Sequence, residues 1–496
     1  MELTSSEEIL EAACDALRRM RDQHGPDFTF PPDVIWHNLP RGVTVPSRFR
    51  PDKPKKLVKI GYLELTGGMT PAQSEEGAGS IRKEYRFGPV LAPRVASTSP
   101  PSLPRAPAAG NMILPLAAPK APSEALVQIQ SFMDSEGYII STVELANFFL
   151  AMIVSPLVIL SGISGTGKSL LPRKFAKRTG ALFHSIPVQP QWEDNSDLFG
   201  YVPTLASAKY VKGALIDGLL SAKANPHKLV IALLDEMNLA PVEHYFSDFL
   251  SVAETRYREG AAISTDALPI ELPALEGESD EHSKLRGMRL PSNLRVVGTA
   301  NMDETTHTFS PKVLDRAFTI EFDDPDLASF ASAGTAGADI FEDLGRIVIA
   351  ESNALSVQEA REDSQDLFDH VAALLVEIQD ILSPAGIKFG YRTRDAILMY
   401  IHFWRECALG DIMAGYAALD FCILQKILPK ISGSGDGLEA ALKALSTWLE
   451  KHSATESDDM TAIAMEFAGP LARSQQKVQR MLTILDLDGA TRFWGA

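Results

Sequence analysis

The sequence predicts an α/β protein in which a five-stranded parallel sheet lies between helices and a helical region follows. Five short apolar runs have strand character, at residues 157–161, 182–188, 229–234, 294–299 and 318–322. Helical stretches separate these runs, and this alternation is typical of a parallel sheet with both faces covered. The first run leads into a glycine-rich loop, and the chain beyond Asp323 reads as helical to its end.

Length and composition bound the architecture. A chain of 496 residues is too long for one ordinary hydrophobic core, so two or three domains are expected. Hydrophobic residues make up 45% and charged residues 22%, as in soluble globular proteins. The net charge of −17 argues against indiscriminate nucleic-acid binding and leaves a local basic groove or pore open.

Cysteine usage and the apolar stretches predict a cytoplasmic protein without membrane contact. The chain has three cysteines, Cys14, Cys407 and Cys422. They show no metal-ligand spacing, which fits a reducing compartment. The acidic N-terminus lacks the basic and apolar regions of a signal peptide. Residues 145–160 are apolar but short, contain Asn147 and are broken by Pro156, so we expect a buried helix that runs into a strand.

The N-terminal segment is predicted to hold a small mixed module of unknown role at residues 1–92. An amphipathic helix is expected at 6–23, and strands at 56–65 and 84–90. A basic run from Arg48 to Lys59 could contact phosphates, although a solvated charged face is the favoured interpretation. Residues 93–122 are rich in Pro, Ala and Ser and predict a semi-extended linker.

The remainder is predicted to form three parts. Ser141 and Glu144 make a capping box ahead of a buried helix. The expected boundaries are an α/β core at 123–324, a helical lid at 325–431 and, after a Gly/Ser break, a C-terminal helical extension at 432–496.

A phosphate-binding loop is predicted directly after the first apolar run. Gly162, Gly167 and Lys168 with Ser169 fit the pattern G-x-x-x-x-G-K-[ST] between a strand and a helix. Glycines let backbone N–H groups surround phosphate oxygens, Lys168 would neutralise the β- and γ-phosphates, and Ser169 would bind Mg²⁺. The predicted nucleotide-binding residues of the loop are Gly162, Ile163, Ser164, Gly165, Thr166, Gly167, Lys168, Ser169 and Leu170.

Polar residues at two later strand ends complete a predicted catalytic set. The run 229–234 ends in Asp235 and Glu236; Asp235 could hold Mg²⁺, and Glu236 could polarise a water for attack on the γ-phosphate. Taken alone, the pair would be better interpreted as a solvated acidic turn, but the upstream phosphate-binding loop favours the catalytic interpretation. Asn301, after the run 294–299, could orient the attacking water, whereas a lone Asn there is usually a turn residue.

Two arginines are candidates for contact with a nucleotide. Arg316 precedes the fifth strand and could stabilise transition-state charge in a neighbouring subunit. A salt-bridged surface arginine is the alternative. Arg392 could act in the same way from the helical lid, where Arg394 competes for the role.

Together these motifs resemble those of AAA+ NTPases: Walker A, Walker B, sensor 1 and the arginine finger, with Arg392 near the expected sensor 2. The segments 190–201, 235–250 and 301–317 are similar to the McrB-like branch, the motor of modified-cytosine restriction systems. The likeness covers roughly residues 140–405. The resemblance implies ATP or GTP with Mg²⁺ as cofactors and a homo-oligomer, a hexamer in this family. It also implies a McrC-like nuclease subunit as partner, with DNA contacted through that partner or through the pore of the ring.

Departures from that branch keep other functions open. Asn301–Glu304 differs from the branch's Asn-Thr-Ala-Asp, and Arg316 stands where the branch has several arginines, so GTP preference is not implied. Inserts typical of the branch are expected at 189–212 and 254–291. The alternatives are a MoxR-like chaperone that remodels protein complexes or assists metal insertion, and a nucleotide-gated scaffold. Comparing ATP and GTP turnover with and without DNA would separate them.

Overall fold

The structure is a computed structural model with two compact units, Met1–Leu114 and Pro115–Ala496. In the second unit it describes residues 121–494 except 204–209, 260–261, 273–279, 303–305, 326, 329, 331–338, 351–355 and 454–460. In the first unit it describes residues 13, 16, 17, 20, 29, 30, 35, 63–71 and 81–87. Each unit is considered by itself.

A three-stranded antiparallel sheet lies in the first unit. Strand β3 (Ile81–Phe87) pairs with β1 (Thr29–Phe30) and with β2 (Leu63–Pro71). The expected strands at 56–65 and 84–90 overlap β2 and β3 but have the wrong bounds, because β2 runs on through two glycines with a register shift. The linker predicted at 93–122 lies outside the described residues except for its last two, of which Ala121 caps a helix and Pro122 begins it. The basic run at 48–59 and most of the helix predicted at 6–23 also lie outside the described residues.

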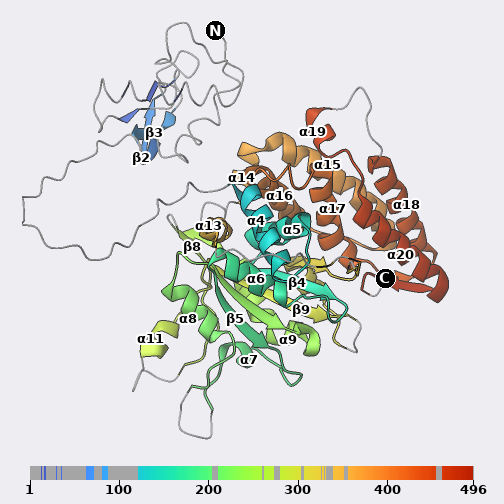
Figure 1. Cartoon of the computed structure of the whole chain (residues 1–496), viewed down its shortest axis with the longest axis horizontal. Helices are drawn as coiled ribbons and strands as arrows, with labels where there is room; N and C mark the ends of the chain where they lie inside the picture. The colour runs from blue at the N-terminus through green and yellow to red at the C-terminus, as the bar shows by residue number, and fades with distance from the viewer. Residues whose placement is uncertain are drawn as a thin grey trace, which may run out of the picture. The chain divides into compact units, whose positions relative to one another are not determined.

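The second unit contains a five-stranded parallel sheet with strand order β10-β4-β9-β6-β5 (Figure 1). The strands are β4 (Leu157–Gly162), β5 (Leu182–Pro187), β6 (Val230–Asp235), β9 (Leu294–Asn301) and β10 (Phe318–Glu321). Every residue of β4 and β9 is buried, which explains why the central strands read as continuous apolar runs. All five strands predicted from the sequence are confirmed.

Helices enclose this sheet and continue beyond it. Those of the α/β part are α4 (Pro122–Ser135), α5 (Thr142–Val154), α6 (Leu170–Thr179), α7 (Ser196–Phe199), α8 (Ile216–Ala224), α9 (Val242–Tyr245), α10 (Ser247–Glu254), α11 (Asp280–Leu285) and α12 (Pro311–Arg316). A short hairpin joins β7 (Tyr257–Glu259) to β8 (Ala262–Ser264). The predicted capping box is confirmed, since the Ser141 hydroxyl accepts from the Glu144 N–H at 3.1 Å.

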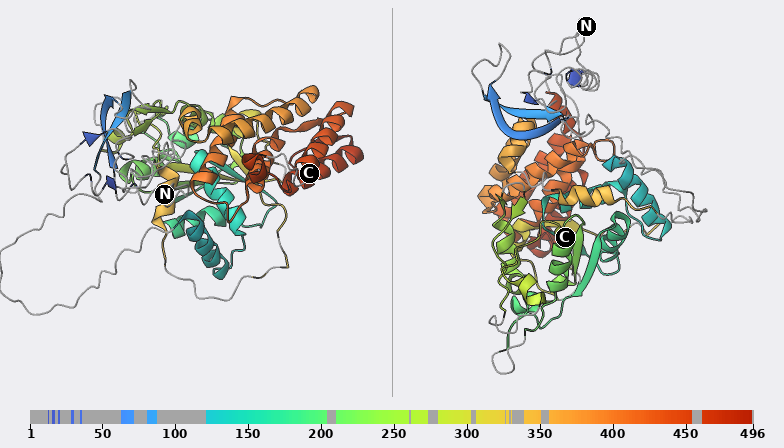
Figure 2. Two further views of the ribbon diagram at one scale, coloured as in Figure 1. Left: turned by 90° about the horizontal axis from the view of Figure 1, so that it is seen from above. Right: turned by 90° about the vertical axis from the view of Figure 1, so that its left-hand side faces the viewer.

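The chain after β10 folds into a helical region (Figures 1 and 2). Its helices are α13 (Glu342–Ile349), α14 (Val357–Asp363), α15 (Gln365–Leu382), α16 (Tyr391–Glu406), α17 (Gly415–Lys426), α18 (Asp436–Ser453), α19 (Ala462–Glu466) and α20 (Ala472–Asp488). The α/β class, with a five-stranded parallel sheet and a helical C-terminal region, is therefore confirmed.

One feature of this region differs from the all-helical prediction. The short strands β11 (Ser432–Ser434) and β12 (Ala490–Arg492) pair antiparallel, so the predicted Gly/Ser break is a strand that meets the end of the chain. Strands β11 and β12 are far apart in sequence, so no local sequence pattern predicts their pairing. Helices α18 and α20 pack against each other and against α15 and α17, which ties the C-terminal segment to the preceding helices.

Buried polar contacts attach the helical region to the α/β part. Asn147 of α5 accepts hydrogen bonds from Tyr400 at 2.8 Å and from Gln425 at 2.7 Å. Lys426 is fully buried and donates to the carbonyls of Leu314, Asp315 and Ala317. Because unmet polar groups are costly in an interior, these bonds make the docking specific.

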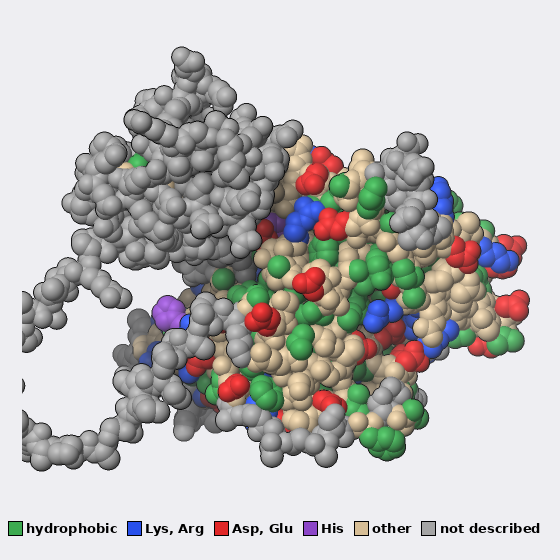
Figure 3. Space-filling model, turned by 45° about the horizontal axis from the view of Figure 1, so that its top comes forward, with side chains coloured by type: hydrophobic (Ala, Val, Ile, Leu, Met, Phe, Trp, Pro, Cys, Tyr) green, Lys and Arg blue, Asp and Glu red, His purple; other side chains and the backbone are tan. Residues whose placement is uncertain are grey.

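The surface of this region is mixed in charge. On the face drawn in Figure 3, acidic side chains lie scattered among basic and hydrophobic ones. The described part of this face therefore shows no continuous basic surface of the kind that binds a nucleic-acid backbone. None of the described helices combines the length and apolar character needed to cross a lipid bilayer.

Candidate functional site

The chain changes direction across the sheet at the carboxyl ends of β4 and β9. The chain leaves β4 toward β5 on one side and leaves β9 toward β10 on the other, so the connections diverge between two neighbouring strands. In open parallel sheets, ligands bind outside the carboxyl ends of strands at such a point. The register places Gly162 beside Asn301, and Asp235 ends the next strand along.

The glycine-rich loop follows β4 at this point, and its glycines are required by its conformation. Gly162, Gly165 and Gly167 have φ of +140°, +86° and +83°. A Cβ on Gly162 would lie 2.6 Å from the Phe322 carbonyl oxygen, and one on Gly167 would lie 2.8 Å from the Tyr138 ring. The loop therefore needs glycine for both backbone angle and space.

Lys168 lies against the loop that it follows. Its side chain is buried, and its ammonium donates to the carbonyls of Gly162 at 3.0 Å and Ile163 at 2.5 Å. The N–H of Ile163 donates to the Asp323 carboxylate at 3.1 Å. Thr166 also donates to the Ile163 carbonyl, at 3.1 Å. An incoming phosphate would compete with Asp323 for the amide and offer Lys168 stronger, charged acceptors.

A hydroxyl and a carboxylate meet behind the loop. The Ser169 hydroxyl donates to Asp235 at 2.6 Å, and the Thr299 hydroxyl donates to the same carboxylate oxygen at 2.8 Å. Hard oxygen donors of this kind suit Mg²⁺, which usually completes its shell with water and substrate phosphates. Ser169 and Asp235 therefore fit the magnesium role predicted for them.

Glu236 lies beside this cluster in an unusual conformation. It has φ of +55°, a left-handed backbone that a non-glycine residue rarely adopts. Its N–H donates to the Thr299 hydroxyl at 2.9 Å, and its carboxylate accepts from the Asn301 amide at 3.3 Å. Strained residues of this kind cluster at functional sites when the surroundings hold them.

The turn after β6 is held by further contacts. The Asn238 amide donates to the Asn301 carbonyl at 2.9 Å and to Thr306 at 2.7 Å. Tyr245 donates to the Met237 carbonyl at 2.9 Å. A Cβ on Gly298 would lie 2.0 Å from the Met237 sulfur, so a larger residue would displace the Met237 side chain that packs here. These contacts fix the positions of Glu236 and Asn301 relative to the loop.

The two predicted arginines lie elsewhere. Arg316 precedes β10, and its carbonyl accepts from Ser155, which precedes β4. It therefore lies near the amino ends of the strands, whereas the loop lies at their carboxyl ends. For a six-residue strand the two places are roughly 15–20 Å apart. Arg392, at the start of α16, joins it there, because both guanidinium groups bind Glu254, at 2.8 and 2.7 Å. The structure brings the arginines to each other and keeps both away from their own loop.

The predicted residues thus fall into two groups. One group lies at the carboxyl ends of the strands and consists of the loop residues with Asp235, Glu236 and Asn301. The two arginines form the other group, near the amino ends of the strands. Sequence reasoning missed Thr299, Asp323 and Glu254. Thr299 stands two residues before Asn301 on the same strand, so a polar residue near a strand end was a usable signal; the other two carried none.

Comparison with known proteins adds little about chemistry. Residues 347–490 match a family model described as a domain of unknown function, DUF8727. No curated protein matches the chain in sequence. A solved structure from Cytophaga hutchinsonii ATCC 33406, described as a "putative ATPase", is similar with a TM-score of 0.37 and 14% identity, over 62% of this chain and 87% of that one. So low a score carries no argument about this chain, and the function is argued from the site.

Proposed function

We propose that the chain is a nucleoside triphosphatase of the AAA+ type that hydrolyses ATP. One observation carries this proposal: a continuous set of hydrogen bonds joins Ser169, Asp235, Thr299, Glu236 and Asn301 beside the glycine loop. The set brings together, from three strand ends, the groups needed for phosphate transfer to water.

Each group has a definite task in this scheme. The loop amides and Lys168 bind the β- and γ-phosphates. Ser169 and Asp235 would hold Mg²⁺, which would supply positive charge against the charge that develops on the phosphate. Glu236 accepts a proton from the attacking water, and the Asn301 amide orients the Glu236 carboxylate. The Glu236 N–H donates a hydrogen bond to the Thr299 hydroxyl, which fixes the backbone of this base.

The arginines support a ring-shaped assembly. Neither Arg316 nor Arg392 can reach the loop of its own subunit, because both lie near the amino ends of the strands. In an oligomer, the loop of a neighbouring subunit could lie beside both arginines. We therefore place Arg316 in the site of the adjacent subunit, with Arg392 beside it, in a homo-oligomer for which the motif resemblance suggests a hexamer.

The McrB-like motifs suggest what the hydrolysis drives. A motor that translocates or remodels DNA together with a separately encoded nuclease, in defence against foreign DNA, agrees best with them. This role rests on the sequence motifs at 190–201, 235–250 and 301–317. Measuring ATP and GTP turnover with and without DNA tests both the nucleotide and the substrate.

Two substitutions test the site. Lys168→Ala should abolish ATP binding, measured by calorimetry, because the loop loses its only cation. Glu236→Gln should keep ATP affinity within a few-fold and lower turnover by at least about 100-fold, a typical effect of losing a general base. Wild-type turnover in Glu236→Gln would exclude it as the base, and unchanged binding in Lys168→Ala would exclude the loop.

A further inference from the structure

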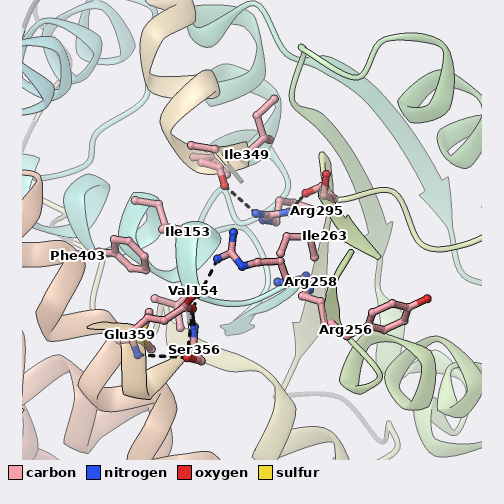
Figure 4. Close-up of a pocket in the computed structure, with 15 residues that line it drawn as sticks. Ile153, Val154, Arg256, Arg258, Ile263, Arg295, Ile349, Ser356, Glu359 and Phe403 are labelled. Carbon is pink, nitrogen blue, oxygen red and sulfur yellow. Dashed lines mark hydrogen bonds and ion pairs between the residues drawn. The ribbon is translucent and has the colours of Figure 1, made fainter. Parts of the chain in front are cut away.

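A cavity of about 370 Å³ lies between the α/β part and the helical region, away from the glycine loop. Its walls come from the end of α5, from β7, β8 and β9, and from α13, α14 and α16 (Figure 4). Cavities of this size suit a small organic ligand. Three arginines line it: Arg256, Arg258 and Arg295.

Arg295 is built into the wall. Its side chain is buried, and it donates to the carbonyls of Met152 at 2.6 Å, Ser292 at 2.7 Å and Val348 at 2.7 Å. Burial, with a smaller effect from the nearby charge of Arg256, lowers the pKa of Arg295 to about 9. Carbonyl dipoles satisfy its hydrogens, but no described carboxylate balances its charge.

Arg258 and Arg256 point into the same space. Arg258 faces Glu359 at 3.6 Å, a loose ion pair whose carboxylate also accepts from the backbone N–H of Ser356 at 2.8 Å (Figure 4). Arg256 has no hydrogen bond or ion pair to any residue that the structure describes. Burial lowers the pKa of Arg256, which reflects the cost of a charge without a partner.

The charges in this lining do not cancel. Among the described residues of the lining, three guanidinium groups face one carboxylate, Glu359, so two positive charges have no carboxylate partner there. Such charge is costly to bury unless an anion pairs with it. The rest of the wall is largely apolar and includes Ile153, Met399 and Phe403.

We propose that this cavity binds a small phosphate monoester, with its dianionic phosphate at Arg256 and Arg258. Two negative charges match the two positive ones without a carboxylate partner, those of Arg256 and Arg295, and the guanidinium forks of Arg256 and Arg258 can pair with phosphate oxygens in a bidentate manner. The apolar body of the ester lies against Met399 and Phe403. The bound ligand contacts both the α/β part and the helical region and therefore stabilises their packing.

The test separates this site from the phosphate loop by using full-length Lys168→Ala protein throughout. Calorimetric titration with phenyl phosphate should reveal one site, and inorganic phosphate should bind it more weakly because it lacks the apolar body. Adding Arg256→Gln should raise the dissociation constant for phenyl phosphate at least about tenfold, as expected for a lost charge-assisted hydrogen bond. Arg361→Gln, on α14 and paired with Asp369 outside the cavity, should change it less than about twofold.

Thermal unfolding supplies a second readout. Without ligand, the melting temperature of the double variant Lys168→Ala/Arg256→Gln should be no lower than that of Lys168→Ala, because the second change removes an unpaired charge. With phenyl phosphate, only Lys168→Ala should gain stability. Unchanged affinity in Arg256→Gln would overturn the proposal, as would equal binding of phenyl phosphate and inorganic phosphate. Should Arg256→Gln not fold, Arg258→Gln takes its place, and unchanged affinity there is equally contrary.

Discussion

The Thr299 hydroxyl connects the two carboxylates of the candidate site. It donates to Asp235 at 2.8 Å and accepts from the Glu236 N–H at 2.9 Å, so one side chain sets the distance between the predicted metal ligand and the predicted base. Thr299 is buried on β9, and its neighbours hold it in place.

Thr299→Val keeps the shape of this side chain and removes its hydroxyl. The Glu236 N–H then loses its acceptor and the Asp235 carboxylate one donor, and bonds to charged groups contribute about 1.5–3 kcal/mol. Turnover of ATP should fall by about tenfold to 100-fold, while ATP affinity stays within a few-fold.

Thr319→Val is the matched control. Thr319 is equally buried on β10, but its hydroxyl donates to the Gln425 carbonyl, away from the carboxylates. Its loss should lower stability and leave turnover per folded subunit unchanged. If both variants lost activity alike, Thr299 would be a packing residue and no more.

At the scale of elements, helix α6 is the support of the glycine loop. Glu136, just after α4, accepts from Lys174 at 3.0 Å, Lys177 at 2.8 Å and Arg178 at 2.5 Å, all on α6. Its bond with Lys177, followed by those with the other two cations, lowers the pKa of Glu136 to about 2. One carboxylate thus fastens α6 to α4.

Glu136→Gln should therefore lower stability in a pH-dependent manner. A carboxyl group whose pKa is lowered by folding stabilises the folded state above its unfolded pKa, near 4.5, and loses this contribution as pH falls toward 2. The melting temperature should drop at pH 7, and the gap from wild type should close between pH 4.5 and 2.

The exposed pair of Lys443 and Glu439 provides the comparison. It lies on α18 with an N–O distance of 2.5 Å and both side chains in solvent, where ion pairs contribute little. Glu439→Gln should leave the melting temperature nearly unchanged at all pH values. A pH-independent loss in Glu136→Gln would show that its charge is not what fastens the helices.

At the scale of the whole molecule, the helical region contacts both ends of strand β10. Lys477 of α20 binds Glu321 at 2.8 Å, two residues before Asp323, which accepts from the loop. At the amino end of β10, Lys426 donates to the carbonyls of Asp315 and Ala317, the residues on either side of Arg316. The helices are thus attached to the loop side and to the arginine side alike.

Mixing subunits tests the arginine across an interface. Arg316→Ala should lose hydrolysis while binding ATP, because its own loop is intact but its neighbour's site lacks a cation. Lys168→Ala subunits lack the loop function and keep Arg316, so mixing the two inactive variants should restore part of the turnover. The recovery should grow with protein concentration, measured by phosphate release.

Arg346→Ala is the control for this experiment. Arg346 is an exposed arginine on α13 that pairs with Glu342 at 3.0 Å, and its loss should leave turnover unchanged. Full activity of Arg316→Ala, or mixtures no more active than their components, would contradict an action in trans.

Local patterns in the sequence determined the elements. The apolar runs at the five strands and the glycines of the loop depend on contacts and backbone angles within a few residues, so they can be read without the fold. The candidate groups at the strand ends followed from them, because parallel strands bring their carboxyl ends to one edge.

Only the tertiary structure decided which side chains meet. Thr299 reaches Asp235 from another strand, Glu254 holds two arginines from distant helices, and Arg256 and Arg295 share a cavity although they lie far apart in the chain. These contacts join residues that are distant in sequence, and the strand order and helix packing that create them arise from the burial of the whole core.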